Sequence, residues 1–284
     1  MGANRGHWFG KTRPLQVMLT TQMTPWIARY RPRPNASVRL FCLPSAGSGA
    51  SSYRDWSDDL SGDIEVLPVQ PPGRENRFVE EPLRRMDDMV ASLIDALRPF
   101  MSDLPFAFFG HSLGGIVALE VARSLARRQG PLPCHMIVSA RPAPHLPLRR
   151  VPVVDLSEEE LESWIRGMQG TSEIVLQSRE MMDLILPVMR ADLEIDDTYR
   201  SGPDPMLACP LTVLGGLHDE EARPEELKEW ARYTRGVFTL RLVEGNHFFP
   251  FNEARPSALA VVEEALTAGL IDAANSCREE PRCR

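Results

Sequence analysis

The sequence predicts an α/β protein built on a mostly parallel, doubly wound β-sheet with one helical insertion. Short apolar segments with the composition of buried strands alternate with amphipathic helical segments along most of the chain. This alternation is typical of a parallel sheet covered by helices on both faces. One stretch, residues 156–199, interrupts the pattern because it contains two or three helical patterns and no strand pattern.

Six short segments are predicted to form the sheet and four longer segments to form its helices. The strands are residues 38–43, 64–69, 104–109, 136–139, 211–214 and 237–242, and the helices are 86–97, 115–129, 224–233 and 254–268. Parallel sheets of this kind bind their ligands at the carboxyl ends of the strands. The residues that follow each strand are therefore the candidates for chemistry.

The chain is predicted to form one domain with a disordered segment at each end. Residues 1–36 are rich in Arg, Pro and Thr without a clear period, and Met23 is an alternative start. Residues 37–270 form the domain, and the polar segment 271–284 is expected to be a disordered tail. The helical insertion spans about 150–203. Because it lies between two core strands, we interpret it as a lid rather than as an ordinary helical subdomain.

Composition and charge exclude several classes of protein. The 284 residues are 43% hydrophobic and 25% charged, and the net charge of −7 argues against nucleic-acid binding. No apolar stretch is long enough to span a bilayer, and no secretory signal is present, so we expect a cytoplasmic protein without membrane association. The default oligomeric state is a monomer. The cysteines have no metal-ligand spacing and are interpreted as reduced thiols: Cys42, Cys134, Cys209, Cys277 and Cys283.

The segment Gly110-His111-Ser112-Leu113-Gly114 has the pattern of a nucleophile elbow. It follows the apolar run 104–109 and precedes a helical segment, which is the strand–turn–helix context that an elbow requires. Glycines on both sides of Ser112 let the strand and the helix approach closely. The alternative is a glycine-rich connector with an unimportant serine. It does not explain why a strand pattern precedes the motif and a helical pattern follows it. Ser112 is therefore the candidate nucleophile.

A serine nucleophile needs a base, and the base needs an acid that orients it. His247 lies in a glycine-bearing loop directly after the last predicted strand, where an elbow-containing fold places its base. Asp219 follows the preceding strand and completes the chain order serine, acid, histidine. Glu220 and Glu221 are immediate alternatives because sequence does not settle one residue of register. Less favoured acids are Asp192 and Asp204.

The chemistry also needs backbone N–H groups that stabilise an oxyanion. One donor is expected from Leu113, the residue after the nucleophile. The second is expected from the glycine-rich loop 44–50 after the first strand. Ala46 is the preferred donor in this loop, with Ser45 as the alternative.

Several segments together resemble the motifs of type II thioesterases, the editing enzymes found beside modular polyketide and nonribosomal peptide synthases. The resemblance covers residues 36–268, and the segment Gln70-Pro71-Pro72-Gly73-Arg74-Glu75 and the helical segment 186–192 are its most discriminating parts. Residues 40–47, 109–115, 139–145 and 245–249 also match. The resemblance implies an α/β-hydrolase fold with a lid.

The resemblance implies hydrolysis of acyl thioesters from the phosphopantetheine arm of acyl or peptidyl carrier proteins, which clears stalled or misprimed chains. Ser112, His247 and Asp219 would be the catalytic residues, and neither a metal nor another cofactor would be required. Candidates for a basic face that docks the acidic carrier are Arg141, Arg149 and Arg150, although ordinary surface charge explains them equally well.

Three other functions use the same residues or the same fold. A general carboxylesterase or lipase would share the triad and differ in access to it. An acyltransferase or macrocyclase would pass the acyl group from the serine to an alcohol or amine. A non-catalytic carrier-binding protein would keep the fold alone, which three apparently intact catalytic residues argue against.

Overall fold

The computed structural model describes residues 24–202 and 206–279. Within them, six strands form one sheet in which every pair of neighbours is parallel, with the spatial order β2-β1-β3-β4-β5-β6. The strands are β1 Val38–Leu43, β2 Ile64–Pro68, β3 Phe106–His111, β4 His135–Ser139, β5 Leu211–Gly216 and β6 Phe238–Val243.

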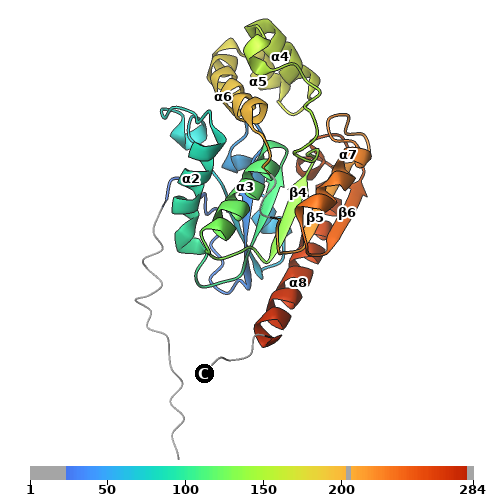
Figure 1. The fold of residues 1–284 in the computed structure, drawn as a ribbon. Coiled ribbons are helices and arrows are strands. Elements are labelled where there is room, and N and C mark those ends of the chain that lie inside the picture. The colour runs from blue at the N-terminus through green and yellow to red at the C-terminus, as the bar shows by residue number, and fades with distance from the viewer. Residues whose placement is uncertain (1–23, 203–205, 280–284) are drawn as a thin grey trace, which may run out of the picture.

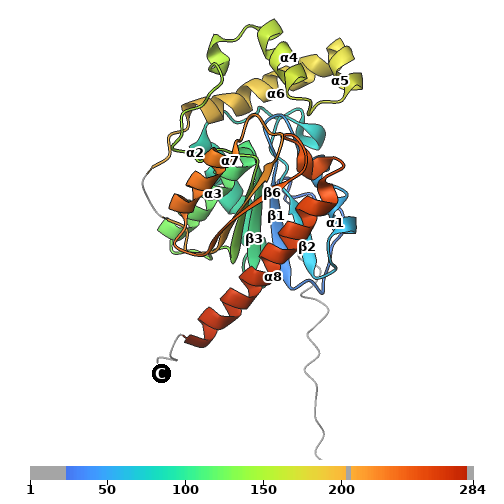
Figure 2. The same cartoon turned by 90° about the vertical axis from the view of Figure 1, so that its right-hand side faces the viewer.

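Helices cover both faces of the sheet and its carboxyl end (Figures 1 and 2). The α-helices are α1 Trp56–Asp59, α2 Met86–Leu97, α3 Leu113–Arg127, α4 Glu158–Gly167, α5 Glu173–Gln177, α6 Arg179–Thr198, α7 Pro224–Lys228 and α8 Arg255–Glu279. Short 3₁₀ helices are Ala50–Tyr53, Glu75–Arg77, Arg98–Phe100, Val153–Asp155, Glu229–Tyr233 and Phe249–Phe251.

The sheet separates two buried apolar clusters. Side chains of α2, α3 and α7 pack on one face, where Phe41 and Phe108 of the sheet meet Ile116 of α3. Side chains of α1 and α8 pack on the other, where Trp56 lies against Phe109. The two faces therefore follow from the period of two along β1 and β3, whose side chains are buried on both sides.

The order of strands reverses at β1, because β2 is added on one side of it and β3 to β6 are added on the other. This reversal is the switch point of a doubly wound sheet. One neighbour of β1 is β3, and the register places Leu43 at the end of β1 beside Gly110. The loop after β1 and the turn after β3 therefore leave the sheet side by side. This is where the sequence placed its candidate nucleophile and its candidate oxyanion donors.

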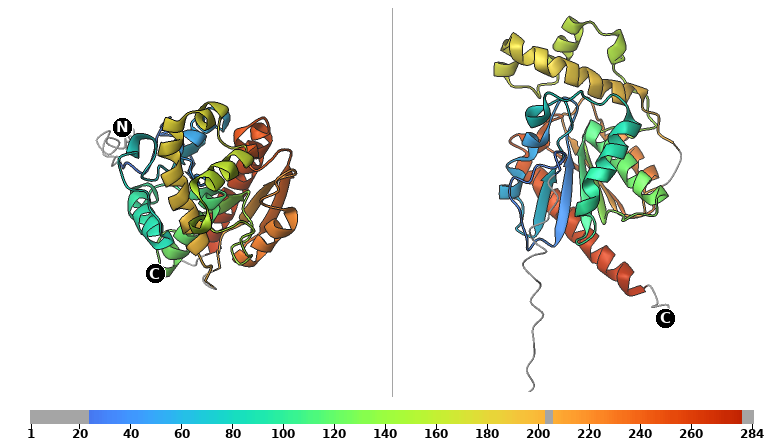
Figure 3. Two further views of the ribbon diagram at one scale, coloured as in Figure 1. Left: turned by 90° about the horizontal axis from the view of Figure 1, so that it is seen from above. Right: turned by 90° about the vertical axis from the view of Figure 1, so that its left-hand side faces the viewer.

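The inserted helices α4, α5 and α6 lie over the carboxyl ends of the strands, as Figure 3 shows from above and from the side. They form a small apolar core of their own, which includes Leu161, Leu186 and Met189. Helix α4 begins at a capping box in which Ser157 and Glu160 exchange hydrogen bonds with each other's backbone N–H. The predicted helical insertion is thus present and lies where a lid would.

Two predictions about the ends of the domain were wrong. Residues 24–36, expected to belong to a disordered extension, are packed: Ile27 forms a β-bridge with Val69, and the guanidinium of Arg77 lies 4.5 Å from the Trp26 ring centroid. Helix α8 continues to Glu279, through much of the segment 271–284 that was expected to be disordered. The rest of both segments, residues 1–23 and 280–284, lies outside the described residues.

Three cysteines are free thiols, as the sequence predicted for them: Cys42, Cys134 and Cys209. Burial raises the pKa of Cys134 to about 11 and that of Cys209 to about 12, so both stay protonated near neutral pH. No helix within the described ranges is long and apolar enough to cross a membrane.

We expect Glu65→Gln to destabilise the protein without affecting its chemistry. The Glu65 carboxylate is 1% exposed and pairs with Arg29 and Arg39 on the sheet. The substitution removes the negative charge beside Arg29 and leaves Arg39 with Asp103 alone. We expect a loss of about 2–3 kcal/mol in the free energy of unfolding, less than for a fully broken buried pair because glutamine still accepts a hydrogen bond. Urea unfolding measures it. Stability equal to that of the wild type would contradict the assignment of this pair.

Candidate active site

Ser112 lies in the turn between β3 and α3 in a backbone conformation that non-glycine residues rarely adopt, with φ 52° and ψ −117°. A Cβ on Gly110 would lie 2.3 Å from the Gly114 carbonyl oxygen, and one on Gly114 would lie 2.2 Å from the Leu43 carbonyl oxygen. Both positions therefore require glycine. This close approach of α3 to β1 and β3 is the geometry of a nucleophile elbow.

The histidine and the acid predicted from the sequence meet in the structure. The Nδ1 atom of His247 lies 3.0 Å and 3.1 Å from the two carboxylate oxygens of Asp219. Asp219 also accepts hydrogen bonds from the backbone N–H groups of Glu221 and Ala222, at 2.9 Å and 3.2 Å. Both side chains are buried. Because the carboxylate accepts the Nδ1 proton, the Nε2 atom of His247 is left as a base.

The structure separates Asp219 from the alternative acids. Glu221 contributes its backbone to the Asp219 carboxylate, and Glu220 accepts a hydrogen bond from Arg149 through its carbonyl oxygen. Asp192 lies on the lid and pairs with Arg74. Asp204 lies outside the described residues.

The contact between His111 and His247 was not predicted from the sequence. The ring centroid of His111 lies 5.3 Å from that of His247, and its Nδ1 atom lies 3.0 Å from the hydroxyl oxygen of Ser139. Burial, with a smaller contribution from His247, holds the pKa of His111 well below its ordinary value. His111 therefore stays neutral beside His247 and does not oppose a positive charge on that ring. The sequence could have indicated that His111 is buried, because it ends the fully buried strand β3.

The candidate oxyanion donors lie on both sides of Ser112. Leu113 is the first residue of α3, where backbone N–H groups lack partners within the helix. Ala46 lines the space beside Ser112, whereas the Ser45 hydroxyl lies 3.0 Å from the Ser48 hydroxyl. The loop 44–50 thus faces the elbow as the register of β1 and β3 dictates.

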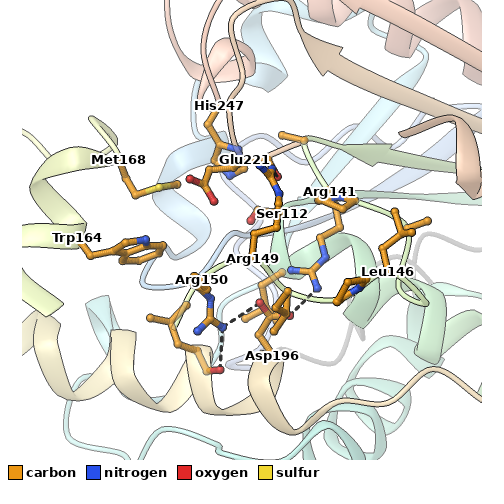
Figure 4. Close-up of a pocket in the computed structure, with 18 residues that line it drawn as sticks. Ser112, Arg141, Leu146, Arg149, Arg150, Trp164, Met168, Asp196, Glu221 and His247 are labelled. Carbon is orange, nitrogen blue, oxygen red and sulfur yellow. Dashed lines mark hydrogen bonds and ion pairs between the residues drawn. The ribbon is translucent and has the colours of Figure 1, made fainter. Parts of the chain in front are cut away.

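Two cavities meet at Ser112 beneath the lid. One, of about 80 Å³, extends past Leu146, Arg149 and Leu193 (Figure 4). The other, of about 360 Å³, extends along the loop 44–50 to Val175 and Phe248. Both are lined by the same five residues, namely Ala46, Ser112, Trp164, Met168 and His247. Figure 4 shows Ser112 and His247 facing the first cavity, with Trp164 and Met168 of the lid across from them.

The three arginines considered for docking a carrier do not form a free basic face. Arg141 is buried and pairs with Asp196 at 2.6 Å. Arg150 pairs with Asp196 and Asp197, and Arg149 pairs with Glu226. Their charges are largely balanced within the protein, so the structure does not support this hypothesis.

No group of three or more His, Cys, Asp or Glu side chains in the described part of the chain is arranged to hold a metal ion. The site that is present consists of a strained serine, a buried histidine–carboxylate pair, and a lid that divides the space above them. Residues 38–266 match the thioesterase-domain family. The chain belongs to the thioesterase family.

Several relatives of this thioesterase are named for biosynthetic pathways. Gramicidin S biosynthesis protein GrsT of Aneurinibacillus migulanus is 36% identical over 229 residues, which are 81% of this chain and 89% of that protein. Thioesterase PikA5 of Streptomyces venezuelae is 41% identical over 224 residues, 79% of each chain. The structure of BorB, described as the type II thioesterase from the borrelidin biosynthetic cluster, is similar with a TM-score of 0.77 at 38% identity and covers 85% of this chain and 97% of that one. The predicted family and α/β-hydrolase fold are confirmed.

We expect Asp219→Asn to lower kcat by about 10³- to 10⁴-fold, because an asparagine amide facing Nδ1 would favour the wrong tautomer of His247. Stopped assays of acyl-thioester hydrolysis measure the loss, and circular dichroism checks that the fold is retained. The matched variants Glu220→Gln and Glu221→Gln change carboxylates that do not contact His247 Nδ1 in the structure. A larger loss in either of these would move the orienting acid away from Asp219.

Proposed function

We propose that this thioesterase hydrolyses acyl groups from the phosphopantetheine arm of carrier proteins in a modular polyketide or nonribosomal peptide synthase, and so removes stalled or misprimed chains. The observation that carries the proposal is the pair of cavities that meet at Ser112. A carrier-bound thioester has a long arm on each side of its carbonyl carbon, the acyl chain on one and the pantetheine on the other. Two cavities that diverge from the nucleophile suit such a substrate.

The residues can perform the reaction by acyl transfer to serine. Ser112 attacks the thioester carbonyl while His247 takes its proton, and the amides of Leu113 and Ala46 stabilise the oxyanion. The pantetheine thiol leaves with a proton from His247. A water molecule, activated by the same histidine, then hydrolyses the acyl-serine. Asp219 orients the imidazole and stabilises its charged form. This sequence requires no metal or redox cofactor.

The names of the relatives support this assignment of substrate. GrsT belongs to gramicidin S biosynthesis, and BorB is described as a type II thioesterase of the borrelidin cluster. The lid and the segment 70–75, which the sequence analysis singled out, are both present around the site. We further propose that the protein acts in the cytoplasm as a monomer.

The test is intact-mass spectrometry of an acetyl- or propionyl-loaded carrier protein incubated with the wild type or with Ser112→Ala. We expect the wild type to regenerate free holo-carrier and the variant to leave the carrier loaded, because the nucleophile is absent. A simple oxoester serves as the comparison substrate. Cleavage of the oxoester with the carrier left loaded would favour a general esterase. Transfer of the acyl group to an added alcohol or amine would favour an acyltransferase.

A further inference from the structure

A buried ion pair ties the lid to the loop that faces the nucleophile. Arg74, in the loop after β2, donates two hydrogen bonds to the carboxylate of Asp192 on the lid helix α6, at 2.5 Å and 2.9 Å. Arg74 is 7% exposed and Asp192 is 1% exposed. A bidentate arginine–carboxylate pair fixes orientation as well as distance, so this contact is one of those that set how α6 lies relative to the body of the protein.

Both members of the pair also hold the loop 44–50. The Asp192 carboxylate accepts a hydrogen bond from the backbone N–H of Gly47 at 2.8 Å. The Arg74 guanidinium donates to the carbonyl oxygen of Ser48 at 3.1 Å. The two atoms belong to the residues that directly follow Ala46, the candidate oxyanion donor. The position of the Ala46 amide is therefore set in part from the lid.

The loop depends on these polar contacts because residues 44–50 are small and supply few side-chain contacts of their own. Its inner side borders a space of only about 20 Å³ that is lined by Ser45, Arg74, Leu113 and Asp192 among others. Its outer side meets α6 so closely that a Cβ on Gly47, whose φ is +73°, would lie 2.4 Å from the terminal methyl of Met189. If the ion pair were lost, the Gly47 N–H and the Ser48 carbonyl oxygen would lose the side chains that hold the loop in place.

Further hydrogen bonds run from the loop after β2 to the same segment. The side chain of Gln70 accepts from the backbone N–H of Ala50 at 2.9 Å, and that of Glu75 accepts from the backbone N–H of Ser51 at 3.1 Å. These two contacts hold the far end of the loop 44–50 without involving the lid. Of the contacts described here, those of Arg74 and Asp192 are the ones that connect the loop 44–50 to α6.

We propose that Arg74 and Asp192 are positioning residues for the oxyanion site, and that seating of the lid helix α6 is what places the Ala46 amide for catalysis. The pair touches the loop and not the reacting atoms, so its effect is on the stabilisation of the transition state. This inference rests on the proposed function only in taking Ala46 as an oxyanion donor. It requires no carrier protein.

The experiment measures hydrolysis of a small acyl-N-acetylcysteamine thioester by Asp192→Asn, Arg74→Gln and the double variant. We expect each single variant to lower kcat by about tenfold or more with KM within about twofold of the wild type, since a misplaced oxyanion donor costs a large part of its contribution. Because the two residues pair with each other and hold the same loop, the double variant should lose much less than the product of the two single losses.

A second readout isolates the oxyanion site. An alkyl boronic acid forms a tetrahedral adduct with a serine nucleophile and presents an oxygen to the oxyanion donors. We expect its inhibition constant to rise by about the same factor as kcat falls. Arg74→Lys is the conservative variant that keeps a positive charge beside Asp192, and it should fold well yet still lose kcat because a lysine cannot donate in the bidentate geometry.

Glu65→Gln is the stability-matched control, since it also breaks a buried ion pair but lies on the sheet at β2. It should keep kcat and the boronate inhibition constant of the wild type. The proposal is overturned if Asp192→Asn and Arg74→Lys both keep kcat and boronate affinity within about twofold of the wild type, or if the double variant loses the product of the two single losses. Failure of the proposed function would appear separately, as a loaded carrier that stays loaded while the small thioester is hydrolysed.

Discussion

The close approach of helix α3 to the end of strand β1 is the constraint on which the site depends. The Gly114 backbone lies against the Leu43 carbonyl oxygen with no room for a side chain. That approach brings the turn that carries Ser112 beside the loop that carries Ala46, and it happens at the position where the order of strands in the sheet reverses. The candidate nucleophile and the candidate oxyanion donors therefore lie together because of how two strands pair, before any side chain contributes.

Buried charge is concentrated where the lid meets the body. Asp192 and Asp196 lie one turn apart on α6, and each pairs with a buried arginine from a different loop. Burial alone would raise the pKa of Asp196, but Arg141 and Arg150 outweigh it and hold the pKa below its ordinary value. Separating such pairs leaves charges without partners in a poorly solvated place, which is costly. The lid helix is therefore held in one orientation rather than resting on an apolar surface that it could slide across.

The fold and the placement of the candidate catalytic residues could be predicted from the sequence because their signals are local. Each strand is a short apolar run, and Ser112, Asp219 and His247 each follow a strand directly. The contacts of Arg74 with Asp192 could not be predicted in the same way, because they join residues that are 118 positions apart and depend on how the lid packs. The packing of Trp26 and Ile27 was missed for a related reason, since a single bridge and a cation–π contact give no periodic pattern. Helix α8 was predicted too short because its last residues, from Ala273 onward, form a polar segment of the sequence without an apolar periodicity.

The sharing of Arg74 and Asp192 between lid and body has a consequence for how such enzymes could be recombined. A lid is usually regarded as an interchangeable part that alters which substrates enter. Here the lid helix supplies a carboxylate that the loop after β2 requires and that the loop 44–50 binds through Gly47. The lid, the loop after β2 and the loop 44–50 would therefore have to be exchanged together. A chimera that exchanged the lid alone would lose the contacts of Asp192 with Arg74 and Gly47 unless the new lid supplied an equivalent carboxylate, whatever the shape of its new cavity.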